Sequence, residues 1–183
     1  MRKVVAAINM TLDGVFDHTA VDPDEEVHQH YADLLRKGGI ALYGRITYQL
    51  MEFWRDLARN PSGDETMDDF AMVMDAIPKM VFSHTLKELD WDSATIANES
   101  IEEEVRALKE QPGKDILVGS RSLIMQLLKL KLIDELQLCI HPIIAGGGMQ
   151  LFENVSDRTL LALAKTKTLS SGAVILYYEP KEV

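Results

Sequence analysis

The chain has 183 residues, a formal net charge of −10 and an apolar fraction of 46%, which together predict one acidic domain, residues 1–183, with a full hydrophobic core. The negative charge argues against binding to nucleic acid or to an anionic membrane surface, because both reward basic side chains. No apolar run approaches the roughly 18–20 residues of a membrane span. The five apolar residues of 4–8 are too few for a secretory signal peptide. We therefore expect a cytoplasmic protein.

The first half of the chain alternates apolar runs with amphipathic stretches. Residues 4–8 form a short apolar run that predicts a buried strand. Residues 22–37 begin with acidic side chains and end before Gly38 and Gly39, which is typical of a helix. By the same criteria we expect strands at 40–43 and 79–82, helices at 47–53 and 67–76, and a long surface loop at 55–69.

The second half continues this alternation and closes with a hairpin. Helices are expected at 101–110 and 122–130, and strands at 116–118 and 135–145. The tail alternates around Ser170-Ser171-Gly172, a pattern typical of a β-hairpin. Strands that alternate with helices indicate an α/β protein whose largely parallel sheet is covered by helices on both faces, and the hairpin adds antiparallel strands at one edge.

Three of the predicted strands end in similar residues. Gly44 and Arg45 follow the second strand, Ser83 and His84 follow the third, and 119–122 (Gly-Ser-Arg-Ser) follow the fourth. In an open α/β sheet, ligands bind at the carboxyl ends of the strands, where glycine permits close approach and a following helix offers free N–H groups. Arginine adds a two-pronged donor for phosphate. Turn and helix-cap chemistry explains each strand end singly, whereas the three together favour a ligand with several phosphates, such as a dinucleotide.

Other chemistries find little support in the sequence. The G-x-G-x-x-G fingerprint after the first strand, the P-loop and the G-x-S-x-G elbow are absent. His28 and His30 lie two residues apart on an expected helix and face different directions, so we expect no metal site. Cys139 lies within an apolar run and is expected in the core, and His141 stands alone and is expected to be structural.

Two carboxylates are candidate catalytic groups. Asp13 follows the first strand in Thr11-Leu12-Asp13-Gly14, where it either forms a turn or contacts substrate. Glu26 stands at the start of the next helix, where it either interacts with the helix dipole or serves as an acid. Both interpretations stay open for each residue on the sequence alone.

The order and spacing of seven segments give the chain a specific resemblance to a known family. The segments are MTLDG (10–14), GRITY (44–48), KMVFSHTL (79–86), ILVGS (116–120), LIDEL (132–136), HPIIAGGG (141–148) and LF (151–152). Together they resemble the dihydrofolate-reductase-like superfamily. More closely, the chain resembles stand-alone bacterial proteins related to the C-terminal reductase domain of bifunctional riboflavin-biosynthesis enzymes. The resemblance covers nearly the whole chain.

This resemblance implies a three-layer α/β/α fold with a mixed, mostly parallel sheet of about eight strands and a C-terminal antiparallel hairpin. It implies NADPH as cofactor and a homodimer as the assembly. By resemblance, the adenosine 2′-phosphate is held by Arg45 and Thr47, and the adenine ribose lies along Ser83 and His84. The pyrophosphate is then cradled by Gly119, Ser120, Arg121 and Ser122, and the nicotinamide is bordered by Ala7, Ile8 and Gly14.

The chain departs from the family pattern where substrate binds. Dihydrofolate reductase carries an acidic side chain in its first helix, and residues 28–34 here offer Asp33 without a clean match. The riboflavin reductases carry a lysine ahead of the Ser-Leu-Asp-Gly turn, and residues 9–14 have no counterpart. We expect an NADPH-dependent reductase of 5-amino-6-(5-phosphoribosylamino)uracil, the alternatives being dihydrofolate reduction or NADPH binding without turnover. Tyr48 and Trp54 are candidate walls of the substrate pocket, and Trp54 as simple core is the other interpretation.

Overall fold

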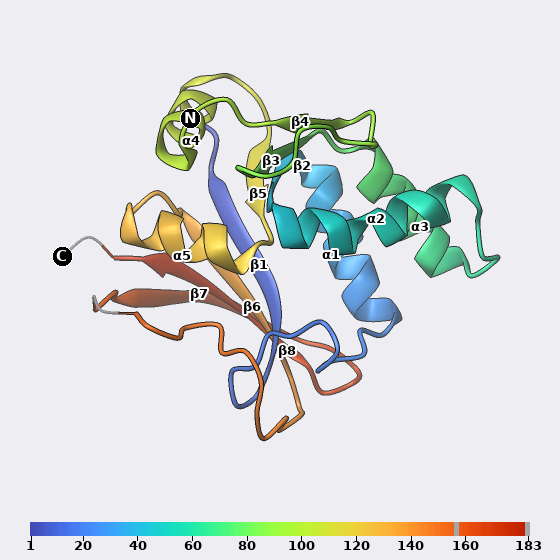
Figure 1. The fold of residues 1–183 in the computed structure, drawn as a ribbon. Helices are drawn as coiled ribbons and strands as arrows, with labels where there is room; N and C mark the ends of the chain where they lie inside the picture. The colour runs from blue at the N-terminus through green and yellow to red at the C-terminus, as the bar shows by residue number, and fades with distance from the viewer. Residues whose placement is uncertain (156–157, 182–183) are drawn as a thin grey trace.

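A computed structural model describes residues 1–155 and 158–181 of the chain (Figure 1). Within them the strands are β1 (Val4–Thr11), β2 (Gly38–Gly44), β3 (Lys79–Phe82), β4 (Ala94–Ile96), β5 (Asp115–Val118), β6 (Glu135–His141), β7 (Leu161–Thr168) and β8 (Val174–Pro180). The helices are α1 (Glu25–Lys37), α2 (Arg45–Arg59), α3 (Glu65–Ala76), α4 (Ile101–Glu110) and α5 (Arg121–Lys129).

All eight strands form one sheet in the order β4-β3-β2-β5-β1-β6-β8-β7. The strands from β4 to β6 are parallel, and β8 joins β6 and β7 in antiparallel fashion. This arrangement confirms the expected α/β fold, with a mostly parallel sheet and a C-terminal antiparallel hairpin. No helix within the described ranges is both long and apolar enough to cross a membrane.

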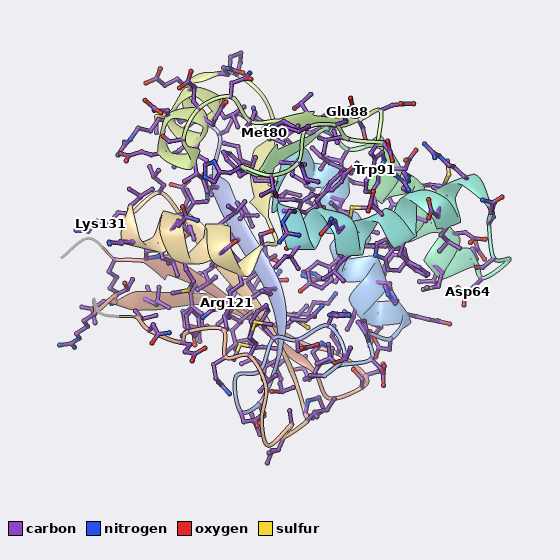
Figure 2. All side chains as sticks on the ribbon, viewed as in Figure 1. Asp64, Met80, Glu88, Trp91, Arg121 and Lys131 are labelled. Carbon is purple, nitrogen blue, oxygen red and sulfur yellow. The ribbon has the colours of Figure 1, made fainter. Side chains whose placement is uncertain are left out.

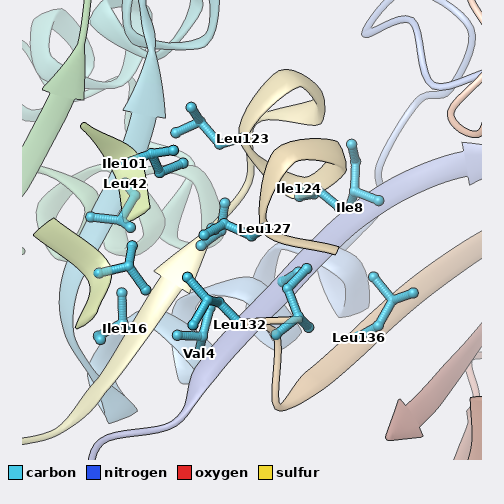
Figure 3. Close-up of a cluster of buried hydrophobic side chains, with 14 of the residues drawn as sticks. Val4, Ile8, Leu42, Ile101, Ile116, Leu123, Ile124, Leu127, Leu132 and Leu136 are labelled. Atoms are coloured by element: carbon cyan, nitrogen blue, oxygen red, sulfur yellow. The ribbon is translucent and has the colours of Figure 1, made fainter. Parts of the chain in front are cut away.

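Helices cover both faces of the sheet, and the alternation of side chains along β1 shows how. Val4, Ala6 and Ile8 pack with residues of α4 and α5, whereas Val5 packs with residues of α1 and α3. Figure 3 shows the first of these two clusters, in which Leu123, Ile124, Leu127 and others of α5 and α4 meet the central strands. A strand that is apolar on both faces is expected in the middle of a parallel sheet, because neither face contacts water.

The structure corrects one expected loop and one strand end, and it adds a strand that was not predicted. The loop predicted at 55–69 is mostly helical, because α2 continues to Arg59 and only five residues, 60–64, join it to α3. Arg55 forms ion pairs with Glu52 and Asp56, which satisfy the polar side chains on the helix surface. The strand predicted to reach residue 145 ends at His141, before Pro142, and β4 was not predicted.

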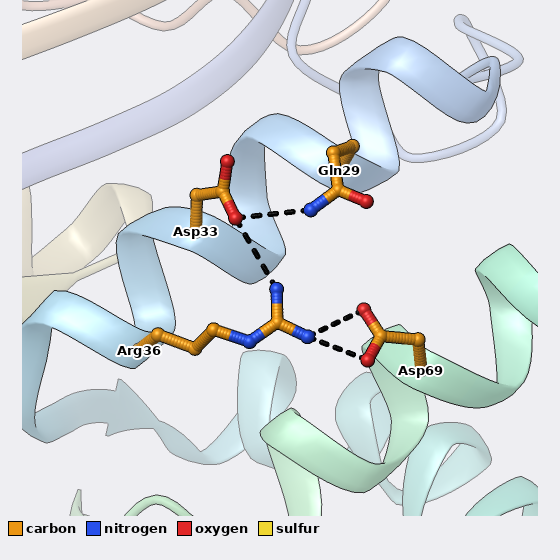
Figure 4. A network of polar contacts seen from close by, with 4 residues as sticks. All are labelled: Gln29, Asp33, Arg36 and Asp69. Atoms are coloured by element: carbon orange, nitrogen blue, oxygen red, sulfur yellow. Dashed lines mark hydrogen bonds and ion pairs between the residues drawn. The ribbon is translucent and has the colours of Figure 1, made fainter.

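A polar contact joins the two helices that cover one face. The Arg36 guanidinium of α1 donates to both carboxylate oxygens of Asp69 in α3, at 2.5 and 2.6 Å (Figure 4). Asp33 accepts from Arg36 and from Gln29 on the same helix. A shallow hollow of about 520 Å³ lies beside this network, against α1 and α3. It is lined mainly by polar and acidic side chains and lies away from the strand ends discussed below.

Lys79 is an unusual buried cation at the start of β3. Its ammonium donates to the carbonyl oxygens of Ile77 (2.8 Å) and Asp75 (3.2 Å) and to the Ser93 hydroxyl (2.8 Å). It also lies 3.9 Å from the centre of the Trp91 ring. Burial lowers the pKa of Lys79 to about 8. These contacts join the end of α3 to the connection between β3 and β4.

Candidate functional site

The carboxyl ends of β3, β2 and β5 lie side by side, as the sequence predicts. In the sheet order these three strands are immediate neighbours and run parallel. Gly44 at the end of β2 pairs with Phe82 at the end of β3, and Leu42 pairs with Val118 at the end of β5. Helices α2 and α5 begin directly after β2 and β5, so the first backbone N–H groups of both helices lie at the carboxyl end of these strands.

Gly44 and Ser120 connect the two helix starts. The Gly44 backbone N–H donates to the Ser120 hydroxyl at 2.8 Å, and the Ser120 side chain is buried. A Cβ on Gly44 would lie 3.2 Å from the Ser122 hydroxyl oxygen, which is tighter than ordinary packing allows. Glycine at this position therefore permits the close approach of the two chain segments.

The N-termini of α2 and α5 differ from those of the other helices. Neither receives a side-chain cap, since Gly44 has no side chain and the Ser120 hydroxyl accepts from Gly44, and neither has an acidic residue in its first turn. The other three helices are capped by Asp24, Asp64 and Ser100, and each has acidic side chains in its first turn. The uncapped N–H groups and the positive dipole ends of α2 and α5 are therefore suited to an anion, although the chain is acidic overall.

The two arginines at these helix starts have different surroundings. Arg45 is exposed, and among the described residues its guanidinium donates only to Gln49 on the same helix, at 3.2 Å. The Arg121 guanidinium (Figure 2) donates to the carbonyl oxygens of Leu151 (3.0 Å) and Glu153 (3.3 Å). Arg121 therefore contacts the loop after β6, and its expected contact with a pyrophosphate stays a prediction.

Three other expected cofactor contacts lie along the same edge. Thr47 is partly buried in the first turn of α2, and His84 is exposed after β3. The Ser83 hydroxyl accepts from the backbone N–H groups of Thr85 (3.2 Å) and Leu86 (3.0 Å), so it stabilises the turn after β3. All three residues follow strands β2 and β3, which are neighbours in the sheet.

The expected nicotinamide contacts lie next to this edge on β1. Ala7 and Ile8 are buried in β1, which pairs with β5, and a Cβ on Gly119 would lie 3.8 Å from the Ala7 carbonyl oxygen. Gly14 has φ of +88°, and a Cβ there would lie 2.7 Å from the Gln150 amide oxygen. Gly14 therefore permits the turn after β1 to pack against the loop after β6.

Asp13 anchors a loop. Its carboxylate accepts from the Thr11 hydroxyl (2.5 Å) and from the backbone N–H groups of Ala145 (3.1 Å) and Gly146 (2.9 Å). These three hydrogen bonds, that of Thr11 above all, lower the pKa of Asp13 to about 2. A carboxylate held in its charged form in this way is a poor proton donor near neutral pH.

Glu26 is engaged by the turn between β7 and β8. Its carboxylate accepts from the backbone N–H of Ser170, at 2.5 Å, and from the Ser170 hydroxyl. Ser170 lies in the turn between β7 and β8. These two strands stand at one end of the strand order, and β3 and β2 lie near the other end. The Ser170 hydrogen bonds lower the pKa of Glu26. This geometry argues against Glu26 as a catalytic acid at the β2–β5 edge.

The two expected substrate-pocket residues lie in the packing between helices. Tyr48 is 2% exposed, and its ring lies 6.2 Å from that of Trp91. Trp54 packs edge-on against Phe70 of α3, at 4.5 Å, and against His28 of α1, at 5.6 Å. The geometry therefore favours the core interpretation for Trp54 and does not support a substrate contact for Tyr48.

One polar cluster on β1 was missed. Asn9 lies on the face of β1 that α1 covers, and its side-chain carbonyl oxygen is 3.2 Å from the Tyr31 hydroxyl and 3.0 Å from the His141 Nε2. The Cys139 sulfur lies 3.7 Å from the same His141 nitrogen. A polar residue inside an apolar strand was the available signal, but its partners lie 22 and 132 residues away. No group of three or more potential metal ligands occurs in the described part of the chain.

Comparison with known proteins agrees with the fold. Residues 2–175 match the model of the RibD C-terminal domain. The Bacillus subtilis (strain 168) protein YyaP is 35% identical over 97% of this chain and 94% of its own length. A Shewanella sp. PV-4 protein named after riboflavin biosynthesis shares 19% identity and a TM-score of 0.73, covering both chains fully. A pyrimidine reductase-like protein of Corynebacterium diphtheriae shares 15% identity and a TM-score of 0.67, over 100% of this chain and 93% of its own. The family match spans nearly the whole sequence, and the chain therefore belongs to the RibD C-terminal domain family.

Proposed function

We propose that this chain is an NADPH-dependent reductase of a pyrimidine-type heterocycle. The observation that carries the proposal is the pair of uncapped, acid-free helix N-termini at the ends of β2 and β5, joined by Gly44 and Ser120. Such a pair suits a molecule with several phosphates, and membership of the RibD C-terminal domain family favours a reductase.

The residues of this edge divide between the parts of the cofactor. Arg45 and Thr47 at the start of α2 would hold the adenosine 2′-phosphate, and 83–84 would lie along the adenine ribose. The pyrophosphate would lie against the N–H groups of 119–122, with the Arg121 side chain serving the neighbouring loop. Ala7, Ile8 and Gly14 would border the nicotinamide, which when bound supplies a hydride to the acceptor.

The proton that completes the two-electron reduction needs a source. Asp13 and Glu26 are the candidates from the sequence, but both carboxylates accept hydrogen bonds from other parts of the chain and both have lowered pKa values. We therefore propose that water or a group of the substrate supplies the proton, while Asp13 positions the loop at 145–146.

The proposed substrate is 5-amino-6-(5-phosphoribosylamino)uracil, with dihydrofolate as the second candidate. The names of two structural relatives, one a riboflavin biosynthesis protein and the other a pyrimidine reductase-like protein, favour the first. The test is a titration of the purified protein with NADPH and with NADH. The oxidation of NADPH is then followed by its absorbance after each acceptor is added. We expect NADPH to bind more tightly than NADH and to be oxidised only when an acceptor is present. Absence of NADPH binding would refute the proposal.

A non-catalytic NADPH-binding module is the rival function. It is favoured by one observation, that neither candidate carboxylate is free to donate a proton. The same titration separates the two functions, because a binding module would bind NADPH and oxidise none of it with either acceptor.

A homodimer in the cytoplasm completes the proposal. Leu163 of the edge strand β7 is 54% exposed, and Met149 and Phe152 of the loop after β6 are also exposed, which supports an apolar contact between two copies. The buried free thiol of Cys139 is compatible with a reducing compartment. Light scattering after size exclusion should give the mass of a dimer, and Leu163→Asp should shift it toward the monomer.

A further inference from the structure

The side chain of Asn9 has one occupied end and one free end. Its carbonyl oxygen is shared by the Tyr31 hydroxyl from α1 and by His141 Nε2 from β6. Its amide nitrogen has no hydrogen-bond partner among the described residues. This nitrogen is absent from the set of fully buried polar atoms without a partner, so it is accessible to solvent. The Asn9 side chain is only partly buried. Two fixed neighbours therefore orient the amide so that its N–H₂ group contacts solvent.

The position of Asn9 follows from the sheet order. It lies two residues beyond Ala7 on the same face of β1, since side chains alternate along a strand. The strands β3, β2, β5 and β1 are consecutive neighbours, so a cofactor that lies across their ends would span about 14 Å at ~4.8 Å per strand and finish at β1. An acceptor molecule must then lie beyond Ala7, where β1 meets β6 and α1.

The side chains that contact Asn9 are uncharged, and the carboxylate that acts on His141 is that of Asp24. Burial lowers the pKa of His141, so its ring carries no charge near neutral pH, and burial raises the pKa values of Tyr31 and Cys139, which stay protonated. Strand β1 contains no lysine or arginine. Such surroundings disfavour a phosphate and suit an uncharged group that accepts hydrogen bonds.

We propose that Asn9 determines acceptor specificity by donating its side-chain N–H to a neutral carbonyl oxygen of the acceptor, with Tyr31 and His141 as positioning residues. This inference rests on the proposed reductase function, because it needs the acceptor to lie next to Ala7. The phosphate of a phosphorylated acceptor would then lie away from this strand, and the uncharged ring carbonyl would contact Asn9.

The test uses 1,3-dimethyluracil, whose polar atoms are carbonyl acceptors, and ribose 5-phosphate as the phosphate-only control, each added to the protein with saturating NADPH. The Asn9 side-chain N–H₂ resonances, identified by their loss in Asn9→Asp, should shift when dimethyluracil is added and stay in place with ribose 5-phosphate. Asn9→Asp keeps an oxygen for Tyr31 and His141 but offers no N–H, so it should bind dimethyluracil about ten-fold or more weakly. Its NADPH affinity should be unchanged.

Each other outcome has a defined meaning. Equal dimethyluracil affinity in Asn9→Asp, or an unmoved N–H₂ signal, would overturn the role of Asn9 while leaving cofactor binding intact. Loss of NADPH binding in the variant would also overturn it, because Asn9 would then belong to the cofactor pocket or the fold. If Asn9→Asp fails to fold, Tyr31→Phe is the second variant, because it removes one of the two donors that orient the Asn9 side chain. Tyr31→Phe should lower the affinity for dimethyluracil several-fold. An unchanged affinity would contradict the proposal. A wild-type protein that does not bind NADPH would refute the proposed function itself.

Discussion

The backbone N–H of Gly44 donates to the hydroxyl of Ser120 across 76 residues of sequence. Through this hydrogen bond the end of β2 is tied to the residue before α5. The Ser120 hydroxyl, which would ordinarily cap its own helix, is occupied, and the first N–H groups of α5 receive no side-chain cap. One contact thus both joins the two strand ends and leaves the helix start available for a ligand.

Replacement of Ser120 by alanine should destabilise the protein. The Gly44 N–H is buried at this point and would lose its partner, which costs about 1–3 kcal/mol. Ser122→Ala is the matched control, since Ser122 is exposed two residues later. Urea unfolding followed by circular dichroism would compare them. Equal stability of the two variants would show that the Gly44–Ser120 hydrogen bond contributes nothing measurable.

Arg45→Ala should weaken the binding of NADPH much more than the binding of NADH. The extra phosphate of NADPH needs a local donor in an acidic protein, and hydrogen bonds to charged groups are worth roughly 1.5–3 kcal/mol, so we expect about a 10- to 100-fold loss. NADH has no phosphate there and should change little. Arg59→Ala removes the same charge from the far end of α2 and serves as control. Isothermal titration of both cofactors measures these affinities. Equal losses of affinity for NADPH and NADH would show that Arg45 does not contact the 2′-phosphate.

Asp13 should stabilise the protein through its charged form. Its folded-state pKa, about 2, lies below the ordinary value of 3.8, so its contribution is present above about pH 4 and is lost as the pH falls toward 2. The difference in unfolding free energy between wild type and Asp13→Asn should therefore shrink over that interval. Amide exchange at Ala145 and Gly146 should be faster in the variant at neutral pH. Turnover that persists in Asp13→Asn would agree with an anchoring role, and complete loss of turnover with unchanged exchange would contradict it.

Lys79 should make stability rise with pH in the alkaline range. Its folded-state pKa, about 8, lies below the ordinary 10.5, because burial disfavours the charged form. Between these values the unfolded chain binds a proton that the folded protein has released, so the free energy of unfolding increases with pH. The difference between wild type and Lys79→Met should grow from about pH 8 to pH 10.5 in urea titrations. A difference that falls with pH would mean that the ammonium form is the favoured one in the folded state.

The sequence predicted the sheet and the neighbouring strand ends because apolar runs, helix punctuation and parallel connectivity are local signals. It failed at the ends of elements and for the shortest strand, where the local pattern of apolar and polar residues is weak. Residues 55–59 look like a polar loop, but Arg55 and its ion-pair partners continue the helix. Three residues with half-exposed side chains are too short a pattern to predict β4.

The candidate site was predicted in the same uneven way. Arg45 and Gly44 follow from a strand end, whereas the engagement of Arg121 with Leu151 and Glu153 depends on a loop about 30 residues away. The neighbours of Asn9 come from α1 and β6, so its orientation could not be read from the residues beside it.

The place of β1 in the middle of the sheet has a consequence for synthesis. It leaves the ribosome well before its two neighbours in the sheet, which begin only at Asp115 and Glu135. At about 5–20 residues per second, the first of these partners emerges roughly 5–20 s later. Until then the apolar residues 4–8 have no strand to pair with, and they present a segment that a chaperone can bind. A chain cut short before Glu135 would lack β6 and would keep that segment unpaired along one side, so truncated products should aggregate rather than persist as a smaller folded unit.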